Sequence, residues 1–217
     1  MFKKEFIVYL FIIAIGFVIG VINFKGNKQF RPIVILLGST LISEIASRVL
    51  AYQIRSSNPA YHFFTPIQIL LWAIFFLLVI TNQKVKMIIF FCSSLLILFS
   101  IINTLFWQGL KIFPENVLRI QTIFMIFCSM CLFIEMMDRP SGENIFKNPF
   151  FIITIGVLWF NLLSFIFFQS HNFFLKNKIP AYSLRTIQYI SNYVYYLIIL
   201  VAILISKQFN TVERKYQ

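Results

Sequence analysis

Seven long apolar stretches, separated by short polar segments, follow one another along the chain. Each is 20 or 21 residues long, and they cover residues 5–24, 32–52, 61–80, 87–107, 117–136, 149–169 and 187–206. A helix of about 20 apolar residues is long enough to cross the roughly 30 Å hydrocarbon core of a bilayer. The pattern therefore predicts an all-α membrane protein, a bundle of seven transmembrane helices joined by short loops.

Composition supports this prediction and excludes a water-soluble enzyme or DNA-binding domain. Of the 217 residues, 59% are apolar and 12% are charged, whereas soluble domains carry about 45–50% and about 25%. No segment outside the seven stretches is long enough for a soluble domain, so we expect residues 1–217 to form a single polytopic membrane domain. The first stretch holds about 19 apolar residues, more than the roughly 7–15 of a signal-peptide core, and is expected to be retained as a span.

The net charge of the chain is +12 at pH 7, which fits a membrane surface. The basic residues are dispersed over both sides of the predicted membrane, which argues against a nucleic-acid partner. Lys and Arg residues lie on both sides of the predicted membrane, where they meet the phosphates of membrane lipids. Seven spans place the two termini on opposite sides, and outside the spans the N-terminal side carries seven basic residues against ten on the C-terminal side. The positive-inside rule then predicts an external N-terminus and a cytoplasmic C-terminus in the inner (cytoplasmic) membrane.

Polar side chains within the spans are gathered in the half of the membrane nearer the N-terminal side. Because a polar side chain in a span is costly, it tends to face the interior of the bundle or a cavity. We therefore expect a polar pocket in this half, closed toward the other side by apolar residues. Its candidate ligand-binding residues are Glu44, Arg48, His62, Gln68, Asn103, Arg119, Gln121, Asn161, Gln188 and Asn192.

The second stretch carries the most continuous polar pattern, in which residues four apart stack on one helical face. The six residues of this stripe are Ser39, Thr40, Ser43, Glu44, Ser47 and Arg48. Glu44 and Arg48 are spaced to form an ion pair, which lowers the cost of holding either charge in the membrane. Simpler interpretations remain open, because small polar residues also serve close helix packing and interhelical hydrogen bonds. Alternatives to ligand binding also remain open for two other candidates. His62 would then be an interfacial residue at the membrane edge, and the side chain of Arg119 would extend to the membrane surface.

Motifs for metal, cofactor or nucleophilic chemistry are not found in the sequence. It has no glycine-rich phosphate loop, no nucleophile elbow and no zinc-binding helix. Cys128 and Cys131 are spaced C-x-x-C but lie in mid-span, without a second pair of Cys or His residues to complete a metal site. The last span has no Lys that could hold retinal. We therefore expect no metal and no cofactor.

Two stretches of the chain resemble a known family. The first, residues 42–76, has a Glu, then an Asn, then the run Tyr-His-x-x-Thr-Pro-Ile, and the second is residues 102–127. Both are similar to a family of small seven-span membrane proteins of Bacteroidota, for which no activity is established. The matching positions are Glu44, Asn58, Tyr61, His62, Thr65, Pro66, Asn103 and Gln108. Gln68 and Gln121 stand where the family is expected to carry acidic residues, which argues against a proton- or cation-coupled mechanism.

Three functions are compatible with this pattern. The first is a binding or sensory module that holds a small amphiphile or a lipid head group in the polar pocket and signals through a partner protein. The second is a channel or transporter subunit. The third is an intramembrane enzyme acting on lipid, with Glu44 as general acid or base, although no nucleophile or metal set supports it. We expect the first, and the sequence does not predict an oligomeric state.

Overall fold

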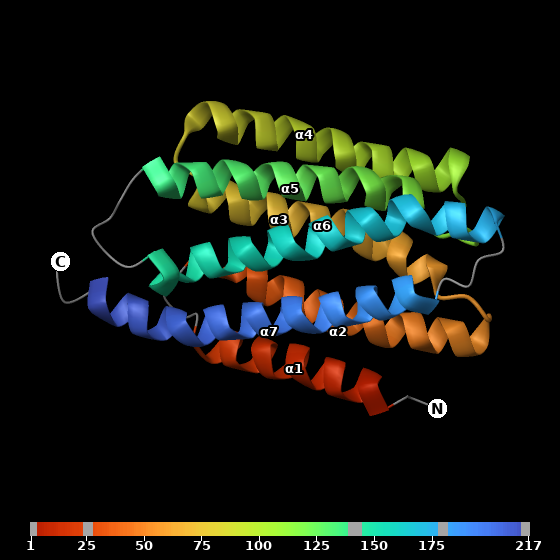
Figure 1. The fold of residues 1–217 in the computed structure, drawn as a ribbon, viewed down its shortest axis with the longest axis horizontal. Helices are drawn as coiled ribbons and strands as arrows, with labels where there is room; N and C mark the ends of the chain where they lie inside the picture. Colours follow the sequence, from red (N-terminus) through yellow and green to blue (C-terminus); the bar gives the residue numbers. More distant parts are fainter. Residues whose placement is uncertain (1–3, 24–27, 139–144, 178–181, 214–217) are drawn as a thin grey trace. The chain divides into compact units, whose positions relative to one another are not determined.

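The computed structural model describes residues 4–23, 28–138, 145–177 and 182–213. Seven α-helices occupy most of these residues (Figure 1). The helices are α1 (Lys4–Asn23), α2 (Arg31–Gln53), α3 (Asn58–Val79), α4 (Gln83–Ile102), α5 (Glu115–Asp138), α6 (Pro149–Lys176) and α7 (Tyr182–Glu213). A π-helical turn, η1 (Asn103–Trp107), continues α4, and a short 3-10 turn, η2 (Ile145–Lys147), precedes α6. The described residues contain no strand.

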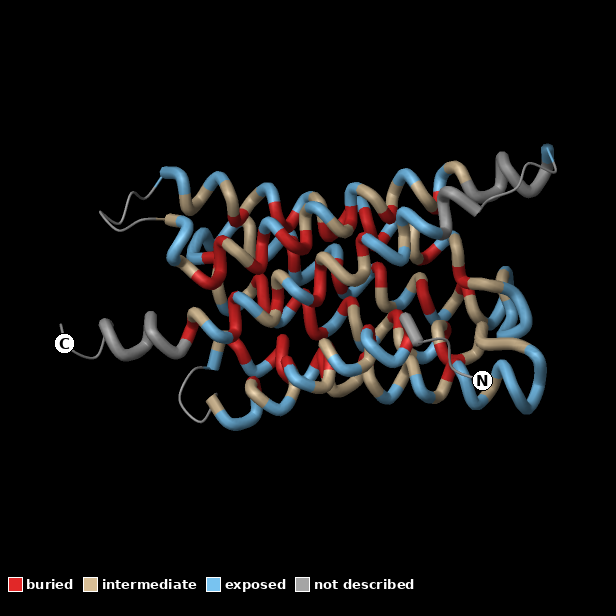
Figure 2. The backbone as a smooth tube through the Cα atoms, turned by 60° about the horizontal axis from the view of Figure 1, so that its bottom comes forward, coloured by how far each residue is buried: buried red, intermediate tan, exposed pale blue. Residues whose placement is uncertain are grey.

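All seven helices are long and apolar enough to cross a membrane, which confirms the predicted fold class. Many large apolar side chains on them are exposed, including Phe11 (64%), Ile42 (71%) and Phe106 (76%). Figure 2 shows exposed positions recurring along each helix beside buried ones. Apolar surface of this extent is suited to lipid and would be unfavourable in water. The protein is an integral multi-pass membrane protein with seven candidate spans.

The helix ends differ from the predicted ends by up to seven residues, most at the C-terminal ends of α6 and α7. For two helices the difference has a local reason. Helix α3 begins at Asn58 and not at residue 61. Pro59 is favourable in the first turn, because a backbone N–H there would have no acceptor within the helix. Helix α4 begins at Gln83, four residues early, because the side chain of Asn82 accepts hydrogen bonds from the backbone N–H groups of Lys84 and Val85. Residue 24, the last of the first predicted span, lies outside the described residues.

The helices fall into two compact units, which are described separately. Unit 1 comprises Met1–Gly26 and Met125–Gln217, and unit 2 comprises Asn27–Phe124. Helix α5 therefore contributes its first ten residues to unit 2 and the rest to unit 1.

In unit 2, α3 is the central helix and packs against both α2 and α4 (Figure 1). Its buried face carries Trp72, Phe75 and Phe76, whose ring centroids lie 5.3–6.0 Å apart. Helix α4 contributes a single narrow stripe of buried residues at helical spacing: Ile89, Ser93, Leu96 and Ser100. Pro66 lies inside α3, where it cannot donate a hydrogen bond to the carbonyl of His62.

In unit 1, α7 is the central helix and packs against α1 and α6. Tyr9 of α1 meets Tyr193 and Tyr196 of α7 edge to face, with centroids 5.9 and 5.5 Å apart. On the other side of α7, a Cβ atom added to Gly156 would lie 2.8 Å from Cγ2 of Ile198. The absence of a side chain at Gly156 therefore allows α6 and α7 to approach closely.

Candidate functional site

Most of the predicted polar residues of unit 2 lie near the end where α2 and α4 finish and α3 and α5 begin. We call this the polar end of unit 2. Here the loop 108–114 connects the π-helical turn η1 to α5 and runs beside the first two turns of α3. Asn58 Nδ2 donates to the carbonyl of Lys111 at 2.7 Å, and the ring of Tyr61 meets that of Phe113 at 5.4 Å. The first turns of α3 therefore hold this loop in place.

His62 provides the most complete of these attachments. The residue is buried, with 5% of its surface exposed. Nε2 lies 2.7 Å from the carbonyl oxygen of Ile112, and Nδ1 lies 2.8 Å from the hydroxyl of Thr104. Because a carbonyl can only accept, Nε2 must carry a proton. Both ring nitrogens are thus engaged with the protein, and the predicted ligand role of His62 stays a prediction.

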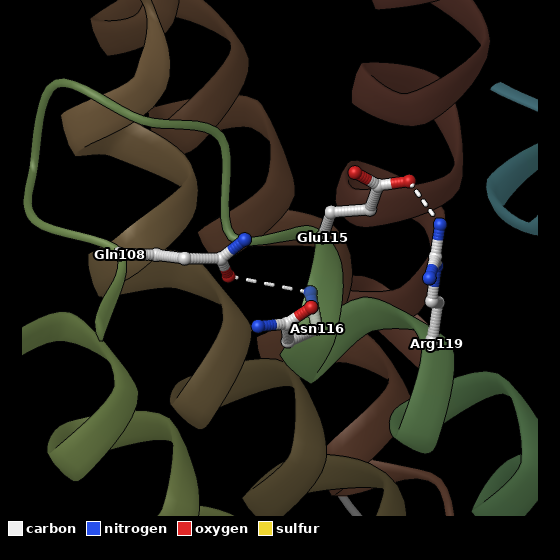
Figure 3. Close-up of polar contacts among 4 residues, drawn as sticks. All are labelled: Gln108, Glu115, Asn116 and Arg119. Carbon is white, nitrogen blue, oxygen red and sulfur yellow. Dashed lines mark hydrogen bonds and ion pairs between the residues drawn. The ribbon is translucent and has the colours of Figure 1, made fainter. Parts of the chain in front are cut away.

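The π-helical turn is closed by an amide pair. Asn103 Nδ2 donates to Gln108 Oε1 at 3.0 Å, and the backbone N–H of Gln108 donates to the carbonyl of Asn103 at 2.6 Å. Gln108 Oε1 also accepts from the backbone N–H of Asn116 at 3.3 Å, which attaches the loop to the first turn of α5 (Figure 3). Asn103 is fully buried, and its Oδ1 has no hydrogen-bond partner among the described residues.

Arg119 has a partner that the sequence analysis missed. Its Nη2 lies 2.6 Å from Oε1 of Glu115, one turn earlier on α5 (Figure 3). The side chains are 26% and 12% exposed. The sequence did contain a signal for this ion pair, because a basic residue follows an acidic residue at a spacing of four. Arg119 is therefore partly neutralised within its own helix.

Gln68 of α3 and Gln121 of α5 form a direct link between two helices. Gln121 Nε2 donates to Gln68 Oε1 at 3.0 Å. Gln121 is 5% exposed, and its own Oε1 has no hydrogen-bond partner among the described residues. The structure thus brings together two residues that lie 53 positions apart and that the sequence placed in one site.

The polar stripe of α2 is only partly buried. Thr40 and Ser47 are buried, Glu44 is half-buried, and Arg48 is exposed. The hydroxyls of Thr40 and Ser47 donate to carbonyls of their own helix at 2.8 Å. These hydroxyls are satisfied locally, as expected for polar groups that accompany helix packing. The ion pair between Glu44 and Arg48 stays a prediction.

Three candidate residues belong to unit 1, on α6 and α7. Asn161 Nδ2 donates to the carbonyl of Val157 at 2.7 Å, and Gln188 Nε2 donates to the hydroxyl of Ser164 at 3.1 Å. Asn192 is half-buried. Gln188 Oε1 and Ser191 Oγ are buried without hydrogen-bond partners among the described residues. Ser164 and Ser191 could not be predicted as members of the site, because single serines carry no distinctive signal in a span.

The ten candidate residues are thus divided, seven in unit 2 and three in unit 1. A single pocket that includes all ten stays a prediction. In the described part of the chain, no three His, Cys, Asp or Glu residues are grouped as a metal site would require. Cys92, Cys128 and Cys131 form no disulfide in the described structure: Cys128 is buried, Cys131 is half-buried and Cys92 is exposed.

Comparisons with known proteins do not assign the chain to a family. No protein-family model, curated protein or solved structure matches the chain. The resemblance to the seven-span family of Bacteroidota therefore stays a prediction.

Proposed function

We propose that the protein is a membrane-embedded binding module that holds the polar head of a small amphiphile in unit 2. The observation that carries the proposal is the carbonyl oxygen of Gln121, which is buried without a hydrogen-bond partner in the described structure. Leaving a buried acceptor unpaired costs about 1–3 kcal/mol. A ligand that donates a hydrogen bond to this oxygen would recover that cost on binding.

The chemistry of the free atom defines the class of ligand. An amide oxygen only accepts, so the ligand must present a donor, such as a hydroxyl, an amide N–H or an ammonium group. The amide nitrogen of Gln121 is already used by Gln68, which fixes the orientation of the side chain. Gln68 is therefore a positioning residue, and Gln121 is the residue that would touch the ligand.

Glu44 lies at a depth that suits the same site. It is nine residues before the end of α2, and Gln68 is ten residues after the start of α3. At about 1.5 Å per residue these positions are about 14 Å and about 15 Å from the helix ends that meet at the short turn 54–57. A half-buried carboxylate at this level favours a donor-bearing or cationic head group. The signal would pass to a partner protein through movement of the helices of unit 2.

The test compares two Gln→Leu substitutions. Gln121→Leu removes the free acceptor, whereas Gln53→Leu makes the same change at an exposed position at the end of α2. Each protein is extracted gently from its own membrane and weighed by native mass spectrometry. We expect a stoichiometric bound molecule in the wild type and in Gln53→Leu that is absent from Gln121→Leu.

Two results would overturn the proposal. One is a wild-type protein that emerges without any bound molecule. The other is a bound molecule that Gln121→Leu retains as fully as Gln53→Leu does. Thermal unfolding of each variant serves as the control for folding, because a folded Gln121→Leu protein without the molecule has lost binding and not structure.

A further inference from the structure

The opposite end of unit 2 carries a different chemistry. Here α2 and α4 begin and α3 finishes, and we call it the basic end of unit 2. Four basic residues lie at this end: Lys28, Arg31, Lys84 and Lys86. Three of them are exposed and Lys86 is half-buried. Unit 2 has only two acidic residues, Glu44 and Glu115, and both lie in the half toward the polar end.

These four cations have no counter-ion in the described structure. An ion pair that the structure shows in unit 2 joins Arg119 to Glu115, and it lies at the polar end. Uncompensated basic side chains at the level of lipid head groups attract anionic lipids by about 1 kcal/mol each. The basic end therefore presents a concentrated positive charge where the phosphates of a leaflet lie.

The backbone places the four cations around one helix end. Gln29 Nε2 donates to the carbonyl of Leu78 at 3.4 Å, which holds the segment before α2 beside the last turn of α3. Helix α4 starts four residues after α3 finishes. One pair of cations thus lies at the start of α2 and the other at the start of α4, and both helices pack against α3.

Helix polarity adds to the charge of this end. Two helices present their N-termini here and one presents its C-terminus, so the helix dipoles contribute a net positive potential. The N-terminus of α4 is capped by Asn82, but Phe30 at the start of α2 provides no side-chain cap. An anion beside Arg31 would meet the uncapped N-terminus of α2.

We infer that the basic end of unit 2 is a binding surface for anionic phospholipid head groups. The two pairs of cations, one in and just before the start of α2 and the other at the start of α4, fit two phosphates rather than one. This surface is independent of the head-group site that we propose around Gln121, because it lies at the other end of the same helices.

The experiment uses matched pairs of substitutions at the two ends. Lys84→Gln with Lys86→Gln removes one cation pair from the basic end, and Arg55→Gln with Lys111→Gln removes two exposed cations from the polar end. A fourfold variant also replaces Lys28 and Arg31 by Gln. Thermal unfolding is measured in detergent with added phosphatidylglycerol, phosphatidylcholine or inorganic phosphate, and native mass spectrometry measures the lipids retained.

We expect phosphatidylglycerol to raise the unfolding temperature of the wild type more than phosphatidylcholine does, and the difference to shrink in high salt. The Lys84/Lys86 variant lacks two charges and should bind phosphatidylglycerol roughly thirtyfold more weakly, as expected from about 1 kcal/mol per charge. The fourfold variant should lose more, and the polar-end variant should bind as the wild type does.

Three outcomes would overturn the inference. The first is equal stabilisation by both lipids, and the second is equal loss of binding in the two matched variants. The third is stabilisation by inorganic phosphate as large as by the lipid, which would indicate a site for free anions. Since all substituted side chains lie at helix ends or in loops, a variant that fails to fold is not expected, and Lys84→Arg with Lys86→Arg should retain the binding.

Discussion

The two ends of unit 2 carry the same number of basic residues but use their polar groups in opposite ways. At the polar end, the side chains of Asn58, His62 and Asn103 make hydrogen bonds to residues of the loop 108–114. At the basic end, Lys28, Arg31, Lys84 and Lys86 have no ion-pair partner in the described structure. Clusters of polar residues in a membrane protein therefore differ in what they do. One end is largely structural, with a few unpaired acceptors, and the other is directed outward to lipid.

The largest effect on stability should come from His62→Leu at the polar end. The substitution leaves the carbonyl of Ile112 and the hydroxyl of Thr104 without their ring partner. We expect a loss of about 2–4 kcal/mol in the free energy of unfolding, measured by denaturation in detergent. Lys86→Leu at the basic end is the control, and a loss there as large as that of His62→Leu would break the comparison.

A double-mutant cycle on Gln68 and Gln121 should give a smaller effect with a distinctive sign. Each single Gln→Leu change leaves one amide without its partner and should cost about 1 kcal/mol. Replacing both residues by Leu removes both side-chain amides, so neither amide is left without a partner. The double variant should therefore be no less stable than either single variant. If the two amides instead contribute independently, the two losses will add and the double variant will be the least stable of the set.

Asn82→Ala tests the basic end by removing the cap of α4. Asn82 Oδ1 accepts from the backbone N–H groups of Lys84 and Val85 at 3.0 and 3.5 Å. We expect a loss of about 1 kcal/mol in the free energy of unfolding. Binding of phosphatidylglycerol should persist, because the cations remain. A variant that keeps its stability but loses the lipid would show that the Asn82 side chain itself binds the head group.

The smallest effect on stability should come from single cysteines that report orientation. In a chain without its own cysteines, Lys84→Cys and Lys111→Cys would lie at the basic and the polar end. The predicted topology places residue 84 in the cytoplasm and residue 111 outside. A membrane-impermeant maleimide should therefore label only Lys111→Cys in intact cells. The reverse labelling would invert the topology and leave the description of both ends unchanged.

The seven spans could be predicted because hydropathy over about 20 residues outweighs every local signal in a membrane helix. The helix ends were less accurate, since they depend on single caps such as Asn82 and on prolines such as Pro59.

For the site, the sequence could predict which residues take part but not which of them make contact. Gln68 and Gln121 were both identified, but their contact spans 53 positions and no periodicity reports it. The contacts of His62 with Thr104 and Ile112 span 42 and 50 positions and depend on the path of a loop. The Glu115–Arg119 pair, by contrast, could have been found from its spacing of four residues within one helix.

The most direct test of the proposed function is a cryo-electron-microscopy structure of the protein extracted together with its native lipids. We expect a ligand donor within about 2.7–3.2 Å of Oε1 of Gln121, in density continuous with an apolar chain. Density that shows this oxygen paired with a protein group, or with water alone, would contradict it.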